Sequence, residues 1–504
     1  MKIEELIKTT DSFIPELYKA MKREIALKQS SSSFENPLIS HIRDMEIAVD
    51  FVLVDLGVSV KAVSQVMGAY EGRFHTKNLL AVLSEGYKLV YGFGNRRNKS
   101  IWGCLKKDIS RFNGGKKLVT YNEISSRLND YGESHLDQDL RNLTLHYDDD
   151  MMKVYNKTVS IYSIDNACRN AIDFFDILKR MMEFGLDIYN EIGIVHHILL
   201  DINKLKFPTY PLDNERLHDV FKKVIDKDGR LQEGLKNFLC TKAGKSLDIV
   251  AGTCKSIERI KDKIKEFKFG NNIAELKNMY VLGNLQMLIQ FMELDLACVL
   301  YSWLVSTSEV EGVMILRRIT IIKVAVLSHL VGYEEDEKQR SIWSFIKAMI
   351  PANNKAIFND AEQIERDFSK LVDSENDRKE RNVYVHYIVG SKQIKLASIA
   401  DSIENLDFFK TIKDMEQMVL LYPKLQKFSK NVMDALGEQV HRQSLESTNA
   451  LLEQNNKNRE LVQSSEMDEK DKQELLASID KMDDFIRDPL KNKDWLTDFS
   501  TVSE

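Results

Sequence analysis

The amino-acid sequence predicts an all-α protein built from two similar helical halves, and three observations support this. Only 7 prolines and 22 glycines interrupt 504 residues, and long stretches without such breakers favour helices over a many-stranded sheet. Apolar residues recur at spacings of three and four, which is typical of amphipathic helices. A short polar motif occurs twice, 240 positions apart, which indicates an internal duplication.

Length and composition limit the possible classes of protein. A chain of 504 residues is too long for one ordinary core, so we expect two or three domains. Hydrophobic residues make up 43% and charged residues 29%, as in ordinary soluble globular proteins. The formal net charge of −6 gives no global attraction to nucleic acid. Any contact with nucleic acid must therefore come from local basic patches.

Cysteine usage and the apolar segments predict a cytoplasmic protein without membrane contact. The five cysteines are scattered and contain no C-x-x-C pair, so neither a zinc site nor a disulfide framework is indicated. This pattern suits a reducing cytoplasm. The N-terminus lacks the apolar core of a secretory signal. The most apolar long segment, 280–305, contains Glu293 and Asp295, and each charge costs roughly 2.5–3.5 kcal/mol in lipid, so we expect a buried core helix.

The repeated motif contains an acid, an arginine, an amide, an imidazole and a phenol at identical spacing in both copies. The first copy comprises Asp137, Arg141, Asn142, His146 and Tyr147, and the second comprises Asp377, Arg381, Asn382, His386 and Tyr387. Arginine is a fixed cation, and histidine is the side chain that titrates near neutral pH. Together they can hold a phosphate and move protons beside it.

Matching landmarks flank both copies of the motif. A Ser-Ile-Trp triplet stands 41 residues before Arg141, at 100–102, and 40 residues before Arg381, at 341–343. An Asp-Phe-Phe triplet follows each motif, at 173–175 and at 407–409, and is expected to open a helix in each half. Ordered matches at nearly constant spacing predict two halves with the same fold.

The spacing of apolar residues predicts most elements of each half. Helices are expected through 47–56 and 79–89 in the first half, and through 282–304 and 313–330 in the second. Between each motif and its Asp-Phe-Phe helix, apolar and polar residues alternate instead. This alternation predicts a short β-hairpin after each motif, at 152–162 and at 387–396.

The alignment of the halves predicts four segments. A first helical domain spans 1–203, a helical connector 204–274, a second helical domain 275–437, and a polar tail 438–504. Pro208 and Pro211 mark the first break, because proline disfavours helix at the preceding residue. The tail contains few aromatic residues, so it is expected to be a solvated helix, a docking element or partly disordered.

The motif residues are suited to cutting a phosphodiester. On a helix, residues four apart share a face, so Asp137 and Asp377 can each pair with the arginine that follows and hold its guanidinium. If the halves pack about a pseudo-twofold axis, two arginines can hold a phosphate and two histidines can act as base and acid. The sequence offers no compact carboxylate cluster for two metal ions. We therefore expect a route without metal or cofactor that uses the 2′-hydroxyl of RNA.

The segments Arg-Asn-x-x-x-His at 141–146 and 381–386 resemble the signature of the HEPN superfamily, the higher-eukaryote and prokaryote nucleotide-binding helical domains. The resemblance implies small helical bundles that pair to join two motifs. It also implies an endoribonuclease of phage defence, abortive infection, a toxin–antitoxin pair or a CRISPR system. Partners would be RNA and an antitoxin, sensor or guide-type regulator. The residues implied as catalytic are Arg141, His146, Arg381 and His386, supported by Asn142 and Asn382.

Other interpretations of these residues remain open at this stage. The arginines can be helix salt-bridge partners and the histidines buried core residues, in a catalytically silent RNA- or protein-binding module or a structural helical adaptor. Whether the chain forms a homodimer is also open. The segment 92–99 combines glycines, Phe93 and basic residues, so it either contacts an RNA backbone or forms an exposed loop.

Overall fold

The computed structural model of the 504-residue chain describes most of its length. The residues described are 3–31, 36–66, 68–94, 97, 100–136, 150–160, 164–193, 250–263, 265, 272–304, 306, 308–350, 354–373, 375–386, 406–465 and 468–487.

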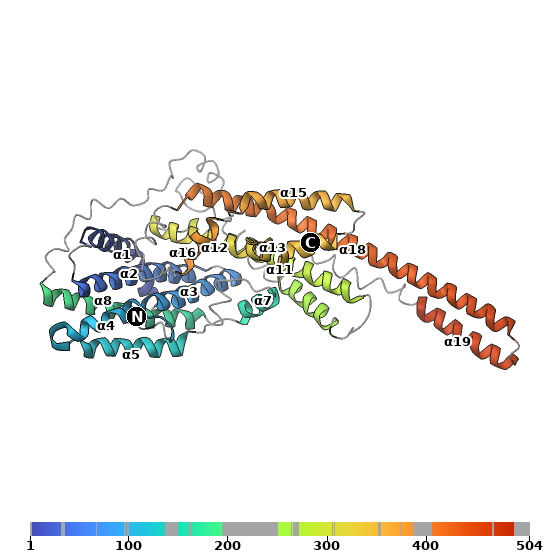
Figure 1. The fold of residues 1–504 in the computed structure, drawn as a ribbon, viewed down its shortest axis with the longest axis horizontal. Coiled ribbons are helices and arrows are strands. Elements are labelled where there is room, and N and C mark those ends of the chain that lie inside the picture. Colours follow the sequence, from blue (N-terminus) through green and yellow to red (C-terminus); the bar gives the residue numbers. More distant parts are fainter. Residues whose placement is uncertain are drawn as a thin grey trace. The chain divides into compact units, whose positions relative to one another are not determined.

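The described part of the chain is all-α, which confirms the predicted class (Figure 1). None of these residues belongs to a strand. The helices, in chain order, are α1 (Ile3–Ser31), α2 (Pro37–Ser64), α3 (Ala69–Val90), α4 (Ile101–Arg111), the 3₁₀ turn η2 (Phe112–Gly115), α5 (Leu118–His135), α7 (Met151–Ser160), α8 (Ile164–Ile192), α11 (Asn272–Leu304), α12 (Glu309–Leu330), α13 (Glu335–Arg340), α14 (Ile342–Met349), α15 (Lys355–Leu371), α16 (Asp377–His386), α18 (Phe408–Ser464) and α19 (Glu469–Arg487).

The chain folds into two compact units, each assembled from separate stretches of sequence. Unit 1 contains Met1–Val250, Leu288–Ser341 and Asp367–Tyr422, and unit 2 contains Ala251–Met287, Ile342–Arg366 and Pro423–Glu504. Helices α11, α15 and α18 contribute residues to both units. The boundaries near residues 203, 274 and 437 were predicted from the alignment of the two sequence halves. They stay predictions.

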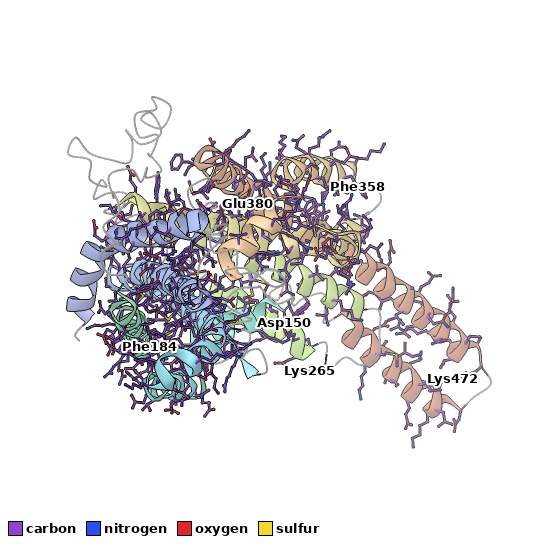
Figure 2. The ribbon with its side chains drawn as sticks, turned by 60° about the vertical axis from the view of Figure 1, so that its left-hand side comes forward. Asp150, Phe184, Lys265, Phe358, Glu380 and Lys472 are labelled. Carbon is purple, nitrogen blue, oxygen red and sulfur yellow. The ribbon has the colours of Figure 1, made fainter. Side chains whose placement is uncertain are left out.

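In unit 1, α2 is the central helix of the N-terminal bundle, because α1, α3, α4 and α8 all pack against it. Trp102 of α4 is fully buried and stacks on Tyr121 of α5, with 4.7 Å between ring centroids. It also packs against Phe184 of α8 at 5.5 Å, and Figure 2 shows Phe184 among the crowded side chains of these helices. The indole Nε1 donates a hydrogen bond of 2.8 Å to Ser125. The first Ser-Ile-Trp triplet therefore anchors a core.

Helices α3 and α12 have the same length and end in the same way. Each spans 22 residues, and each is followed by a glycine with positive φ, 76° at Gly92 and 74° at Gly332. The N–H of Gly92 donates to the carbonyl of Tyr87, and that of Gly332 donates to the carbonyl of Leu327. Glycine takes this conformation without the strain that a side chain would cause, so it terminates the helix.

Trp343 of α14 occupies a setting in unit 2 that resembles that of Trp102. Its Nε1 donates a hydrogen bond of 3.1 Å to Glu365 of α15, and its ring lies 5.1 Å from that of Phe428 on α18. Phe184 and Phe428, the phenylalanines that contact the two tryptophans, each lie twenty residues after the first residue of their helix.

The expectation that an Asp-Phe-Phe triplet opens a helix in each half is wrong for the first copy. Phe174 lies well inside α8, which begins at Ile164, whereas Phe408 is the first residue of α18. The side chain of Phe174 is fully buried and stacks on Tyr131 of α5 at 5.0 Å. Phe174 is therefore a core position in the middle of a helix, and the two triplets do not correspond in position.

The first predicted β-hairpin, at 152–162, is also wrong. Residues Met151–Ser160 form the helix α7, which begins where the carboxylate of Asp150 accepts a hydrogen bond of 3.1 Å from the backbone N–H of Met152. Such side-chain caps start helices. Met152 and Val154 are buried, and a short apolar run does not separate strand from helix by spacing alone. The second predicted hairpin, at 387–396, lies outside the described residues.

Helix α11 contains the single window among the described helices that is long and apolar enough to cross a membrane, Leu276–Trp303, with a mean hydropathy of 1.2. Within the protein, 78% of this window is buried. Asp295, in its middle, accepts a hydrogen bond of 2.7 Å from the hydroxyl of Tyr70. These contacts are those expected of a core helix.

In the described part of the predicted tail, α18 ends at Ser464 and α19 runs from Glu469 to Arg487. Asn455 donates to Asp483 at 2.6 Å, and Arg459 pairs with Asp480 at 2.8 Å. These contacts join α18 and α19 as an antiparallel pair of helices.

Candidate functional site

The structure describes most of the second motif but none of the first. Helix α16 begins at Asp377 and ends at His386, and it also contains Arg381 and Asn382. Asn382 and His386 are four residues apart on this helix. The first copy, from Asp137 to Tyr147, and Tyr387 lie outside the described residues.

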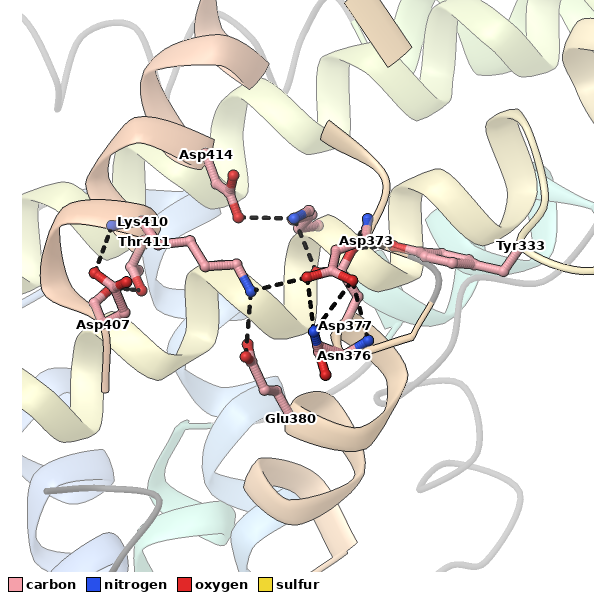
Figure 3. A network of polar contacts seen from close by, with 10 residues as sticks. Tyr333, Asp373, Asn376, Asp377, Glu380, Asp407, Lys410, Thr411 and Asp414 are labelled. Atoms are coloured by element: carbon pink, nitrogen blue, oxygen red, sulfur yellow. Dashed lines mark hydrogen bonds and ion pairs between the residues drawn. The ribbon is translucent and has the colours of Figure 1, made fainter. Parts of the chain in front are cut away.

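Asp377 is held by a buried polar network at the start of α16 (Figure 3). Its Oδ1 lies 2.9 Å from Nζ of Lys323 on α12, and both side chains are only 1% exposed. Its Oδ2 accepts hydrogen bonds from the hydroxyl of Tyr333, at 3.1 Å, and from the backbone N–H of Asp373, at 3.0 Å. The network fixes the first turn of the motif helix against α12.

Asp377 does not pair with Arg381, contrary to the prediction from the sequence. The carboxylate oxygens of Asp377 accept from Lys323 and Tyr333 instead. A buried carboxylate needs a close cation and hydrogen-bond donors, and Lys323 supplies the cation from the helix on which α16 packs. Arg381 donates from Nη1 to Oδ1 of Asn382 at 3.0 Å. Asp377 thus positions the helix, and Asn382 orients the guanidinium.

The network continues into the start of α18. Nζ of Lys323 also lies 2.7 Å from Oδ2 of Asp414, whose pKa is raised because burial outweighs the attraction of that ammonium group. Figure 3 shows Lys410 between two further carboxylates, 3.2 Å from Glu380 and 3.5 Å from Asp373. Burial lowers the pKa of Lys410, but Glu380 and the neighbouring aspartates raise it more, and the net shift is upward. Ion pairs therefore join α12, α16 and α18.

Arg378 attaches the outer face of α16 to the segment after α12. It donates to Glu334 at 2.6 Å and also to Glu337, and its guanidinium lies 5.3 Å from the ring centroid of Tyr333. Burial of Tyr333, together with the charge of Asp377, raises the pKa of its hydroxyl far above the usual value. The hydroxyl of Tyr333 therefore stays a hydrogen-bond donor to Asp377 at neutral pH.

Arg381 is a largely buried cation. Burial lowers the pKa of its guanidinium, the positive charge of Arg378 lowers it further, and the carboxylate of Glu85 on α3 acts in the opposite direction. Arginine nevertheless keeps its charge in proteins. Arg378 is itself paired with Glu334 and Glu337.

The motif helix contacts elements from both halves of the sequence. Val385 packs with Ala81 of α3 and Ile321 of α12. Nη1 of Arg317 on α12 donates to the carbonyl of Tyr384 at 3.3 Å, and the same guanidinium pairs with Asp55 on α2. The second motif therefore lies where helices of the two sequence halves meet within unit 1.

Buried polar contacts also join helices of the two sequence halves within unit 1. The sequence did not predict these contacts. Arg318 of α12 donates to Ser59 of α2 at 3.0 Å, and His75 of α3 lies 2.9 Å from the hydroxyl of Ser302 on α11. Burial lowers the pKa of His75. Charged residues within otherwise apolar helical segments were the sequence feature that could have predicted these buried contacts.

The described residues contain no group of three His, Cys, Asp or Glu side chains placed to bind a metal ion. No family model matches the chain, and no curated protein or solved structure matches it. Function is therefore inferred from the residues and their geometry.

Proposed function

We propose that the protein is a metal-independent endoribonuclease with one composite active site. Arg141, His146, Arg381 and His386 are its catalytic residues, supported by Asn142, Asn382, Asp137, Asp377, Tyr147 and Tyr387. The observation that carries the proposal is the position of α16, which contacts α3 of the first half through Val385 and Ala81. A composite site requires each motif to lie at the contact between the halves.

The proposal includes an internal duplication of two HEPN-like helical bundles. The equal lengths of α3 and α12 support it, as do the glycines that end them 240 positions apart. The similar surroundings of Trp102 and Trp343 are a second, independent support. Under this proposal the first motif lies on a helix equivalent to α16 and faces Arg381 and His386.

The chemistry needs only the groups of the two motifs and the RNA. One histidine accepts the proton of a 2′-hydroxyl as its oxygen attacks the adjacent phosphorus. The other histidine donates a proton to the 5′-oxygen as the phosphorus–oxygen bond breaks. The products are a 2′,3′-cyclic phosphate and a 5′-hydroxyl. Arg141 and Arg381 offset the charge that develops on the phosphate, and the Arg381–Asn382 hydrogen bond of 3.0 Å supports the orienting role of the asparagine.

The resemblance to HEPN proteins also motivates the proposed setting, a cytoplasmic defence or toxin–antitoxin system in which a regulatory partner restrains the enzyme. The alternative is a catalytically silent RNA- or protein-binding module. The burial of Arg381 favours this alternative, because a phosphate must reach the guanidinium.

Cleavage of mixed RNA by the purified chain in excess chelator tests the proposal. A composite site predicts that either His146→Ala or His386→Ala removes most activity, because the motifs act as a unit. Two independent sites would leave about half in each single variant. His41→Ala, at a partly exposed histidine of α2, is the matched control. Cleavage that survives the double variant refutes the site, and RNA binding without cleavage supports the alternative.

A further inference from the structure

The segment that follows α3 holds an aromatic side chain at the surface. Gly92 and Gly94 both have positive φ, 76° and 53°, and they flank Phe93. A Cβ added to Gly94 would meet no atom within 4 Å, so the loop is open on that side. Phe93 is partly exposed.

Phe93 is backed by a rigid cluster of aromatic rings. Its centroid lies 5.0 Å from that of Tyr87, which in turn lies 5.6 Å from Tyr91 and 6.1 Å from Tyr131. These three tyrosines are buried. A ring held in this way loses little conformational freedom when a flat ligand stacks on it.

Arg97 lies beside this cluster with binding capacity that no described residue uses. Its guanidinium is 5.4 Å from the ring centroid of Tyr91. Its positive charge partly offsets the effect of burial, which raises the pKa of Tyr87 to about 12. The Nε atom of Arg97 is buried and has no hydrogen-bond partner among the described residues. The side chain of Arg97 as a whole is only partly buried, so its guanidinium is accessible to an anionic oxygen of a ligand.

The corresponding segment after α12 has the opposite character. Tyr333, 240 positions after Phe93, is buried and donates to Asp377. Four consecutive acidic residues follow it, Glu334, Glu335, Asp336 and Glu337. The segment after Phe93 instead contains Arg96, Arg97 and Lys99. A phosphate is attracted to the first segment and repelled by the second.

The loop lies close to the second motif through α3. Ala81 contacts Val385 of α16, and Glu85 is near enough to Arg381 to act on its charge. From Glu85 to the end of α3 at Val90 the helix advances roughly 7–8 Å. Phe93 therefore follows the end of α3 that lies beyond the residues near the second motif.

We infer that Phe93 and Arg97 form a subsite for single-stranded RNA, in which one base stacks on Phe93 and a neighbouring phosphate contacts Arg97. The position of this subsite relative to the cut rests on the proposed function, whereas its binding of RNA does not. Stacking on an aromatic ring tolerates any base, so the subsite holds the strand without selecting sequence.

A fluorescent RNA that cannot be cut tests this inference on the full chain. The probe is a fully 2′-O-methylated decamer that carries 2-aminopurine, whose emission is quenched by stacking. Phe93→Leu is expected to weaken binding at least fivefold and to abolish the quenching, while Phe93→Tyr retains both. Arg97→Gln is expected to weaken binding about tenfold at low salt and to reduce its salt dependence. The control is Phe345→Leu, at an exposed phenylalanine of α14, which should bind like the wild type.

The outcomes separate the subsite from the nuclease. Quenching that depends on Phe93, in a protein that cuts no RNA, supports the subsite and contradicts the proposed function. Cleavage of RNA by a protein whose Phe93→Leu and Arg97→Gln variants bind the probe like the wild type overturns the subsite alone. A wild-type chain that fails to bind the probe also overturns it.

Discussion

Lys61 of α2 and Glu311 of α12 form an ion pair of 2.8 Å across 250 residues of sequence, with side chains only 1% and 3% exposed. The pair between Asp55 and Arg317 joins the same two helices. The free energy needed to remove two charges from water nearly cancels their mutual attraction, so the net contribution of such pairs to stability is small. We expect them to set the register of α2 against α12, because any shift leaves charges buried without partners.

Breaking the Lys61–Glu311 pair from one side should be costly. Glu311→Leu leaves a buried ammonium group and is expected to lower the free energy of unfolding by about 3–5 kcal/mol. The double variant Lys61→Met/Glu311→Leu should recover most of this loss. Urea unfolding at pH 7 measures both. Glu335→Leu, which removes an exposed pair with Lys338, is the control and should change stability by less than about 1 kcal/mol. A double variant as unstable as the single one would contradict this account.

The polar network around Asp377 at the start of α16 leads to a second prediction. Asp377→Asn removes the charge that faces Lys323, and because Asp414 remains, we expect a loss near the lower end of the same range, about 3 kcal/mol. Tyr333→Phe removes one hydrogen bond and should cost about 1 kcal/mol. Thermal unfolding of both variants gives the comparison. Equal stabilities of Asp377→Asn and the wild type would show that the network does not hold the helix.

The helices were predictable because the signals that make them are local. Gly92 and Gly332 end α3 and α12 where the sequence shows breakers, and apolar spacing identified the buried faces. The partner of Asp377 was not predictable, since Lys323 lies 54 residues away and reaches the site through packing of α12 on α16. The helix at Met151–Ser160 was missed because ten residues of mixed apolar and polar character fit both periods.

Two glycines with positive φ should respond differently to alanine. A Cβ on Gly332 would lie 2.5 Å from the backbone nitrogen of Lys338, whereas a Cβ on Gly94 would meet nothing within 4 Å. Gly94→Ala carries only the strain of the left-handed conformation, about 1 kcal/mol. Gly332→Ala adds a clash with backbone and should destabilise the protein by at least 2 kcal/mol. Chemical denaturation of the two variants side by side checks the order, and the reverse order would contradict the described C-terminus of α12.

Asp50 of α2 should make stability depend on pH. Burial raises its pKa well above the usual value, and Glu24 of α1 raises it further. A carboxyl whose pKa is higher in the folded state keeps its proton after the unfolded chain has lost it. Stability therefore falls as pH rises from the unfolded value toward the folded one, by up to about 1.4 kcal/mol per unit.

Asp50→Asn should accordingly be more stable than the wild type at pH 7, and the difference should shrink toward pH 4. Urea midpoints of the two proteins at several pH values give this difference. Tyr189 and His75 are present in both proteins. Asp50 helps to raise the pKa of Glu46, so the difference measures Asp50 together with its effect on Glu46. A constant difference across the range would contradict the assignment.

The 250-residue separation of Lys61 and Glu311 also affects folding during synthesis. A ribosome adds about 5–20 residues per second, so α2 waits roughly 12–50 s for the helix that neutralises its charges. During that interval Asp55 and Lys61 cannot form their pairs with Arg317 and Glu311. For the proposed nuclease, a nascent chain that has not reached residue 377 carries at most the first motif, so the composite site cannot form.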